Sequence, residues 1–343
     1  MLRLTITILI ALFACLLVGA DASRMYIVDD DGFAQYHSIG EAVAIANDGD
    51  TIYIKPGIYE EHIVLDKSLT LMPPRGEEGD VNLASDGSDI GIEVLADGCK
   101  IEGLTITDFA GPGIFVESKG NEIRKNSFAD NVHGIFLNNT SGNLLEMNRM
   151  EGGYCGIVLL ASRENIIRSN VADGCILAGV LLNSSSKNDI VGNEAKGCTR
   201  GVYLITKSQE NQVNGCSMVD CDYGVLLEKS SQANVIIGCD FENSTTALAL
   251  NGVSKSQIQN NSIANSTNGI VLFSSAENSA VENEFVRVDT GIMISESSAG
   301  NIFTNNEIEE SSSGIVITDS PANKFEGNVQ TKVRWGLYVD GST

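Results

Sequence analysis

Apolar and polar residues alternate along most of this chain, and the alternation returns with a period of 22 or 23 residues. In each period a glycine, replaced once by Ala247, is followed by apolar residues one and three positions later, as in Gly134-Ile-Phe-Leu and Gly269-Ile-Val-Leu. Such alternation is typical of short β-strands, and a fixed period of this length is typical of a solenoid. A second motif, Asn-x-apolar-x-x-Asn, keeps the same period. Its ten copies begin at Asn121, Asn143, Asn165, Asn188, Asn211, Asn234, Ser256, Asn278, Asn301 and Asn323.

One period is long enough for one coil of a right-handed parallel β-helix, in which each strand pairs with its equivalent about 4.8 Å away in the next coil. Alternate side chains then point into a shared interior, so that Ile114, Ile135 and Ile157 stack in one column. The aligned asparagines can bond to the backbone and to the next coil. A leucine-rich repeat has a similar period, but it requires an L-x-x-L-x-L motif that this sequence lacks. The predicted fold is therefore all-β, a right-handed parallel β-helix of about eleven or more coils.

Residues 23–90 differ from the repeats, and we expect them to form an N-terminal cap and the first coils, whereas residues 91–343 form the regular β-helix. Ser38-Ile-Gly-Glu41 is a capping box that opens a short helix continuing to Asn47. A cap is useful because exposed strand edges at the end of a parallel stack promote aggregation. At the other end, Trp335–Asp340 forms a fresh strand, so this coil is expected to be open or to pair with a partner.

Residues 1–22 have the features of an export signal. Arg3 supplies the basic region, an apolar segment extends from Leu4 to Gly19, and Ala20-Asp-Ala22 resembles a cleavage site. We therefore expect a secreted, extracellular or cell-surface protein. The alternative is an uncleaved signal anchor, which would be the chain's means of membrane association.

The chain carries a formal net charge of -23. A phosphate backbone would be repelled, so nucleic acid is excluded as an expected partner. Polyanionic sugars meet the same objection unless a cation bridges them. Charge of this kind is also typical of a soluble extracellular surface.

The first part of the chain resembles the start of the NosD-like family. The residues that carry the resemblance are Tyr26-Ile-Val-Asp-Asp, Ser38-Ile-Gly-Glu-Ala42, Gly49-Asp-Thr-Ile52, Pro56-Gly-Ile-Tyr-Glu60 and Ser68-Leu-Thr-Leu71. This family is similar to the wider class of parallel β-helix repeats in carbohydrate-binding proteins and sugar hydrolases. The resemblance implies a β-helix over the whole mature chain, and through its namesake it implies a periplasmic accessory role in copper-site maturation.

Copper receives little support from the residues themselves. The three histidines His37, His62 and His133 are scattered, and no ligand-spaced cluster is visible, so we predict no metal site. The motifs of sugar-cleaving β-helix enzymes are also incomplete. Val132-His-Gly134 matches only half of the Gly-His-Gly of polygalacturonase-like enzymes.

Carboxylates nevertheless stack on adjacent coils. Glu284 and Glu307 occupy the same outward position one period apart, and Glu151 and Asp173 do likewise. Side chains about 5 Å apart would suit a retaining glycosidase pair or a calcium site. The alternative is an acidic face exposed to solvent, on which these like charges simply repel.

An apolar stripe is expected two positions after each strand glycine, where alternation places the side chain on the outside. A contiguous stripe usually marks a ligand, a partner or self-association, although strand propensity alone can also produce it. Phe115 stacked on Phe136 could form a platform for a sugar ring, and Tyr203 and Leu226 are further candidate contacts. The stripe comprises Phe115, Phe136, Val158, Leu181, Tyr203, Leu226, Ala249, Val271, Met293, Val316 and Tyr338.

Seven cysteines follow the signal, and several lie one period apart. Cys175, Cys198 and Cys221 form one such column, and Cys216 and Cys239 replace ladder asparagines in another. We expect buried thiols, because in-register side chains are too far apart for favourable disulfide geometry. Oxidation after export is the alternative.

Three functions remain open from the sequence. The first is a non-catalytic surface protein that binds a polysaccharide or a surface protein along the helix face, with self-association through the stripe or the last coil as a variant. The second is a polysaccharide lyase or glycoside hydrolase acting through the stacked carboxylates. The third is the NosD-like accessory role. No cofactor is predicted, and calcium is the alternative.

Overall fold

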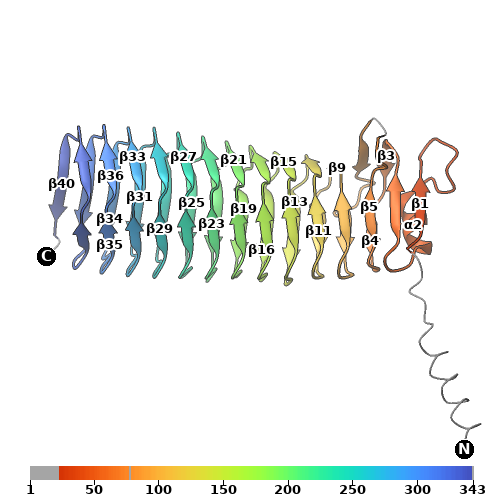
Figure 1. Ribbon diagram of the computed structural model, residues 1–343, viewed down its shortest axis with the longest axis horizontal. Helices are drawn as coiled ribbons and strands as arrows, with labels where there is room; N and C mark the ends of the chain where they lie inside the picture. Colours follow the sequence, from red (N-terminus) through yellow and green to blue (C-terminus); the bar gives the residue numbers. More distant parts are fainter. Residues whose placement is uncertain (1–22, 77–78, 342–343) are drawn as a thin grey trace, which may run out of the picture.

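The computed structural model describes residues 23–76 and 79–341, which form one elongated stack of coils (Figure 1). Three parallel sheets, here called A, B and C, run along the stack with 14, 13 and 13 strands. The predicted all-β parallel β-helix with one short helix is confirmed. The predicted export signal, residues 1–22, lies outside the described residues. Within the described part of the chain, no helix is long and apolar enough to cross a membrane.

Sheet A runs the full length of the stack, and most of its strands hold one Asn-x-apolar-x-x-Asn motif. Its strands are β1 (Met25–Val28), β2 (Thr51–Ile54), β5 (Thr70–Met72), β8 (Lys100–Glu102), β11 (Glu122–Arg124), β14 (Leu144–Glu146), β17 (Ile166–Arg168), β20 (Asp189–Val191), β23 (Gln212–Asn214), β26 (Val235–Ile237), β29 (Gln257–Gln259), β32 (Ser279–Val281), β35 (Ile302–Thr304) and β38 (Lys324–Glu326).

Sheet B follows sheet A in each coil, and the two are joined at the second asparagine of the motif. Its strands are β3 (Gly57–Glu60), β6 (Val81–Ala84), β9 (Leu104–Thr107), β12 (Ser127–Ala129), β15 (Arg149–Glu151), β18 (Val171–Asp173), β21 (Glu194–Lys196), β24 (Ser217–Val219), β27 (Asp240–Glu242), β30 (Ser262–Ala264), β33 (Glu284–Val286), β36 (Glu307–Glu309) and β39 (Val329–Thr331).

Sheet C contains the glycine motif and has the longest strands, most of them six residues. Its strands are β4 (Ile63–Leu65), β7 (Ile92–Val94), β10 (Pro112–Val116), β13 (His133–Asn138), β16 (Cys155–Leu160), β19 (Ala178–Asn183), β22 (Arg200–Ile205), β25 (Tyr223–Glu228), β28 (Thr246–Asn251), β31 (Asn268–Phe273), β34 (Thr290–Ser295), β37 (Ser313–Thr318) and β40 (Trp335–Asp340).

The interior consists of columns of apolar side chains, one residue from each coil. Ile114, Ile135 and Ile157 lie in register and are fully buried, as their period predicts. The strand glycine also faces inward. A Cβ on Gly224 would lie 2.3 Å from the ring of Phe241, so glycine is required there by packing.

Two ladders of buried asparagine close the corners between sheets. Asn148 is representative, because its side chain donates to the Ile123 carbonyl at 2.8 Å and to the Asn170 side chain at 3.0 Å. Its own Oδ1 accepts from the backbone and the side chain of Asn126, each at 3.1 Å. The predicted role of the asparagines is therefore confirmed: they satisfy bend amides that burial removes from water.

The two ends of the stack differ. At the N-terminal end, α2 (Ile39–Ile45) lies beside β1 (Figure 1), and the Ser38 hydroxyl accepts from the Glu41 amide, as the capping box predicts. At the C-terminal end, Leu337 and Val339 occupy interior positions yet are 62% and 47% exposed.

All seven described cysteines are buried and carry free thiols. The expected columns form, and the amide of Cys175 donates to the sulfur of Cys198 at 3.4 Å. Burial raises the pKa of Cys155 and of Cys221 to about 12. At these two positions the thiolate needed for oxidation or metal binding is therefore scarce at neutral pH.

Candidate functional site

The predicted apolar stripe lies on the outer surface of sheet C, and we call the outward positions of β10 to β40 the C-sheet face. Its first members, Phe115 and Phe136, are half-buried. Tyr203 and Leu226 are only 7% and 6% exposed. These two residues point outward as alternation predicts, but they are much less accessible than a solvent-facing stripe would be.

The low exposure arises because neighbouring coils pack against one another on the outside of the sheet. Val158, Tyr203, Leu226 and Ala249 form a second hydrophobic cluster with Cys155 and Ala178, separate from the interior. Burial of this apolar area stabilises the stack directly. Part of the stripe therefore serves the protein's own packing, and the remaining exposed part is available to a ligand.

Aromatic rings gather at the N-terminal part of the C-sheet face. The rings of Phe115 and Phe136 are 5.6 Å apart with an angle of 44° between them. His133 lies edge-on to Phe136 at 5.6 Å and to Tyr154 at 6.1 Å. Burial lowers the pKa of His133, which keeps its ring neutral at neutral pH. We call these four residues the aromatic group.

A second group lies three coils further along the face and was missed from the sequence. The guanidinium carbon of Arg200 sits 4.7 Å from the ring centre of Tyr203 and 6.0 Å from that of Tyr223. The Tyr203 hydroxyl donates to Glu228 at 2.5 Å, and Asn251 donates to the same carboxylate at 3.1 Å. Burial and the Glu228 carboxylate together raise the pKa of Tyr203, so its hydroxyl stays protonated. We call these five residues the arginine group.

The C-sheet face is depleted of charge in an otherwise acidic protein. The outward positions from β13 to β37 contain only two charged residues, Arg200 and Glu228. Sheets A and B instead expose ion pairs such as Arg168 with Glu146. The sequence register could have revealed this low charge, since the first, fourth and sixth residues of each six-residue strand of sheet C point outward.

The stacked carboxylates lie on the outer surface of sheet B. Glu284 is in register with Glu307, and Glu151 with Asp173, so the expected pairs exist. The two pairs are five coils apart from β18 to β33, roughly 24 Å at 4.8 Å per coil, and cannot form one site. Asp173 also lies 3.7 Å from Arg149, which relieves part of its repulsion.

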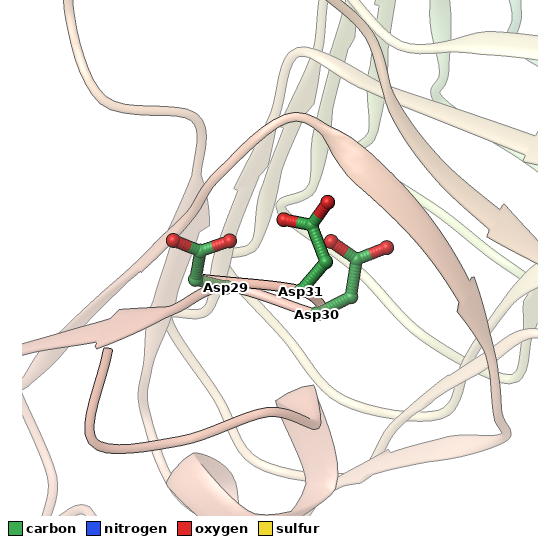
Figure 2. A group of neighbouring side chains, drawn as sticks. All are labelled: Asp29, Asp30 and Asp31. Atoms are coloured by element: carbon green, nitrogen blue, oxygen red, sulfur yellow. The ribbon is translucent and has the colours of Figure 1, made fainter. Parts of the chain in front are cut away.

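Among the residues that the structure describes, one group of carboxylates lies close enough to hold a cation, and it was not singled out from the sequence. Asp29, Asp30 and Asp31 follow β1 in one turn (Figure 2), with one oxygen of each within 4.8 Å of the others. Asp29 is already paired with Lys55 at 3.2 Å, and Asp30 accepts from the Ile58 amide at 2.9 Å. Protein partners thus satisfy two of the three carboxylates.

These donors do not fit copper. Copper in proteins favours imidazole and sulfur ligands, whereas the aspartate group offers only carboxylate oxygens, which suit hard cations. His37 and His62 each have one ring nitrogen at a backbone carbonyl, of Asp29 and Ile90 respectively. Within residues 23–76 and 79–341, no group of three or more His, Cys, Asp or Glu brings imidazole or thiol donors together for a metal.

The family model described as periplasmic copper-binding protein (NosD) matches residues 43–247 and 200–333. The chain belongs to the NosD family. The resemblance seen in the sequence is therefore confirmed. No curated protein matches this NosD-family chain.

Several solved structures share the solenoid. The catalytic domain of a GH87 α-1,3-glucanase in complex with nigerose is 14% identical, with a TM-score of 0.54 over 94% of this chain. The A-module of the Azotobacter vinelandii mannuronan C-5 epimerase AlgE6 is 13% identical, with a TM-score of 0.64 over 85% of this chain and 93% of that one. The Dettilon tailspike protein is 13% identical, with a TM-score of 0.54, and 82% of this chain and 62% of that one are covered. The NosD-family chain spans 66% of the length of the glucanase domains. Likeness at this identity shows the fold alone.

Proposed function

We propose that this NosD-family protein is a non-catalytic glycan-binding protein that holds an elongated carbohydrate along the C-sheet face. The observation that carries the proposal is the aromatic group at the start of a long face depleted of charge. Phe115 and Phe136 are half-buried, so part of each ring remains accessible. The apolar face of a sugar ring can lie on such rings, while the polar edges of the sugar keep their contact with water.

The shape of the face supports a linear ligand. Strands β10 to β40 repeat at about 4.8 Å, so eleven outward positions extend over roughly 50 Å in a straight line. A polymer chain can make the same kind of contact on successive coils, and many weak contacts then add.

Two comparisons support the class of ligand and the location. The glucanase structure contains a bound sugar and the epimerase is named for mannuronan, which supports a carbohydrate. The family is described as periplasmic, which supports a place outside the cytoplasm, in agreement with the predicted export signal.

Replacing the aromatic platform tests the proposal. We expect Phe115→Ser with Phe136→Ser to weaken binding to any captured polysaccharide at least tenfold, because about 1.5–3 kcal/mol of apolar burial is lost. Calorimetric titration of the purified mature chain against a polysaccharide panel measures this.

Ile166→Ser is the matched control, since Ile166 is an exposed apolar residue on sheet A. It should leave binding unchanged. Equal affinity of the double phenylalanine variant and the unmodified chain would overturn the proposed face.

A lyase or hydrolase is the competing function, favoured by the in-register carboxylates Glu284 and Glu307. Incubation with the same panel, with and without calcium, should release no reducing ends. Release that is lost on Glu284→Gln or Glu307→Gln, or on substitution of Glu151 or Asp173, would replace the non-catalytic function with an enzymatic one.

A further inference from the structure

The proposed function leaves open which glycan is bound, and the arginine group addresses this. We propose that Arg200 is the binding site for a sugar carboxylate, so that the preferred ligand of the C-sheet face contains uronic acid residues. This inference rests on the proposed glycan function. It narrows the ligand to a chemical class and assigns the recognition to one side chain.

The guanidinium of Arg200 has no ion pair among the described residues, although the protein is strongly acidic. Its contacts are the rings of Tyr203 and Tyr223, and its Nε is a buried nitrogen without a hydrogen-bond partner. Stacking on an aromatic ring offsets part of the cost of removing a cation from water. The ring contacts do not use the N–H donors of the guanidinium, and among these the buried Nε has no partner.

A carboxylate is the group that these donors fit best. The guanidinium is a planar fork of N–H donors that binds a carboxylate through two parallel hydrogen bonds. The contact with the Tyr203 ring restricts the Arg200 side chain and so reduces the rotamer entropy lost on binding. A sugar hydroxyl would satisfy one donor, whereas a carboxylate satisfies two and also balances the charge.

The nearest acid of the face is held by other partners. Glu228 accepts the Tyr203 hydroxyl and the Asn251 amide, one on each oxygen. Glu228 therefore links the Tyr203 hydroxyl to Asn251 on β28. Remaining lone pairs of this carboxylate can accept hydroxyl groups of the same sugar chain.

The overall charge of -23 does not prevent an acidic ligand from reaching this position. Outward positions from β13 to β37 carry one cation and one anion, so the local face is neutral. Other acids lie outside these positions, and charges beyond a Debye length of about 8 Å are largely screened at physiological ionic strength.

The two groups are placed to contact one oligosaccharide. Phe136 on β13 and Tyr203 on β22 are three coils apart, about 14 Å at 4.8 Å per coil. Between them the face is formed by Val158 and Leu181, which are apolar and uncharged. A short oligomer can therefore rest on the aromatic rings and place a carboxylate at Arg200.

The test compares acidic oligosaccharides with their neutral esters. Oligogalacturonate and oligomannuronate, and the methyl ester of each, are titrated into the mature chain by calorimetry. We expect at least one acid to bind more tightly than its ester, with a preference that falls as salt concentration rises. Arg200→Gln should weaken binding of that acid by roughly 10-fold to 100-fold and leave the ester unchanged. Arg200→Lys should recover part of the loss, since it keeps the charge without the fork.

Arg149→Gln is the matched control, because it removes the same charge from the outer surface of sheet B. Thermal unfolding of each variant checks that the fold is retained. Equal binding of acid and ester, or an Arg200→Gln variant that binds the acid as the unmodified chain does, would overturn the carboxylate site and leave the glycan proposal standing. Loss of binding to every probe and to the neutral panel would remove both proposals.

Discussion

At the scale of single residues, the asparagine ladders show how a buried polar side chain can stabilise a fold. Each ladder amide is removed from water, and its donors and acceptor are satisfied by the coil on either side. Asn148 has four such hydrogen bonds, two donated and two accepted. Losing one side chain therefore affects groups on both neighbouring coils.

Asn148→Ala should lower the free energy of unfolding by about 1–3 kcal/mol or more, because the Ile123 carbonyl and the Asn126 amide lose their buried partners. Urea unfolding followed by circular dichroism measures the change. Asn183→Ala, at an outward position of β19, is the control and should change stability by less than about 0.5 kcal/mol. Equal losses in the two variants would contradict the role assigned to the ladder.

The buried thiols make stability depend on alkaline pH. Cys155 and Cys221 have a pKa of about 12 in the folded protein, above the value of about 8.5 in an unfolded chain. The folded state thus holds protons that the unfolded state releases. This stabilisation is complete below about pH 8.5 and is lost as pH rises toward 12.

We expect the urea midpoint to fall between pH 8 and pH 10, by an amount corresponding to roughly 2 kcal/mol for each thiol. The double variant Cys155→Ala with Cys221→Ala should fall less over the same interval, although it starts lower because of lost packing. Parallel slopes for the two proteins would show that other groups cause the alkaline loss.

Residues that recur with the period were predictable, and residues that occur once were not. The interior column through Ile135 and the asparagines at the bends follow from spacing alone. Arg200 and Glu228 each stand at an outward position occupied by other residue types in neighbouring coils, so no periodic signal marks them. Their proximity depends on register and on the direction of each side chain, which the sequence pattern does not contain.

At the scale of strands and helices, the strand glycine of sheet C sets how closely sheet C approaches sheet B. The position faces inward, and its space is filled by the neighbouring strand. A Cβ on Gly224 would meet Phe241 at 2.3 Å and the Ala247 carbonyl at 2.5 Å. The backbone and the ring would have to move apart to accept it.

Gly224→Ala should therefore destabilise the protein by about 1–3 kcal/mol through overpacking, despite the general preference for alanine over glycine in a strand. Ala247→Gly changes the equivalent position of the next coil in the opposite sense and should cost about 0.5–1 kcal/mol. Thermal midpoints compare the two. A stabilised Gly224→Ala variant would show that the corner has room.

The helix illustrates the limit of prediction for elements. The capping box correctly gave its start, but the predicted end at Asn47 was two residues too far. Ala46 already has extended backbone dihedrals, and the Asp50 carboxylate accepts the amide of Asn47 at 2.8 Å. That hydrogen bond holds the chain in a turn that leads into β2.

The solvent exposure of the apolar stripe was likewise overestimated from the sequence. Contacts between outward side chains of neighbouring coils determine that exposure, and the sequence pattern does not show them.

At the scale of the whole molecule, the stack is a one-dimensional structure in which each coil contacts mainly its two neighbours. The sequence length and the 22- or 23-residue period predicted this architecture well, because each coil repeats the strand pairing of the coil before it. Function was less predictable for the same reason: the solenoid supplies a surface, and single residues such as Arg200 decide what that surface recognises.

The hydrogen bonds between coils point along the long axis, and this has a mechanical consequence. Tension applied between the two ends of the stack acts parallel to those hydrogen bonds, so they break one coil at a time. The last coil should detach first, since the interior residue Leu337 is 62% exposed there. Each later step should release 22 or 23 residues, a contour length of roughly 75–80 Å. Single-molecule stretching should therefore give a regular sawtooth at modest force, whereas one large rupture would mean that the coils fail together.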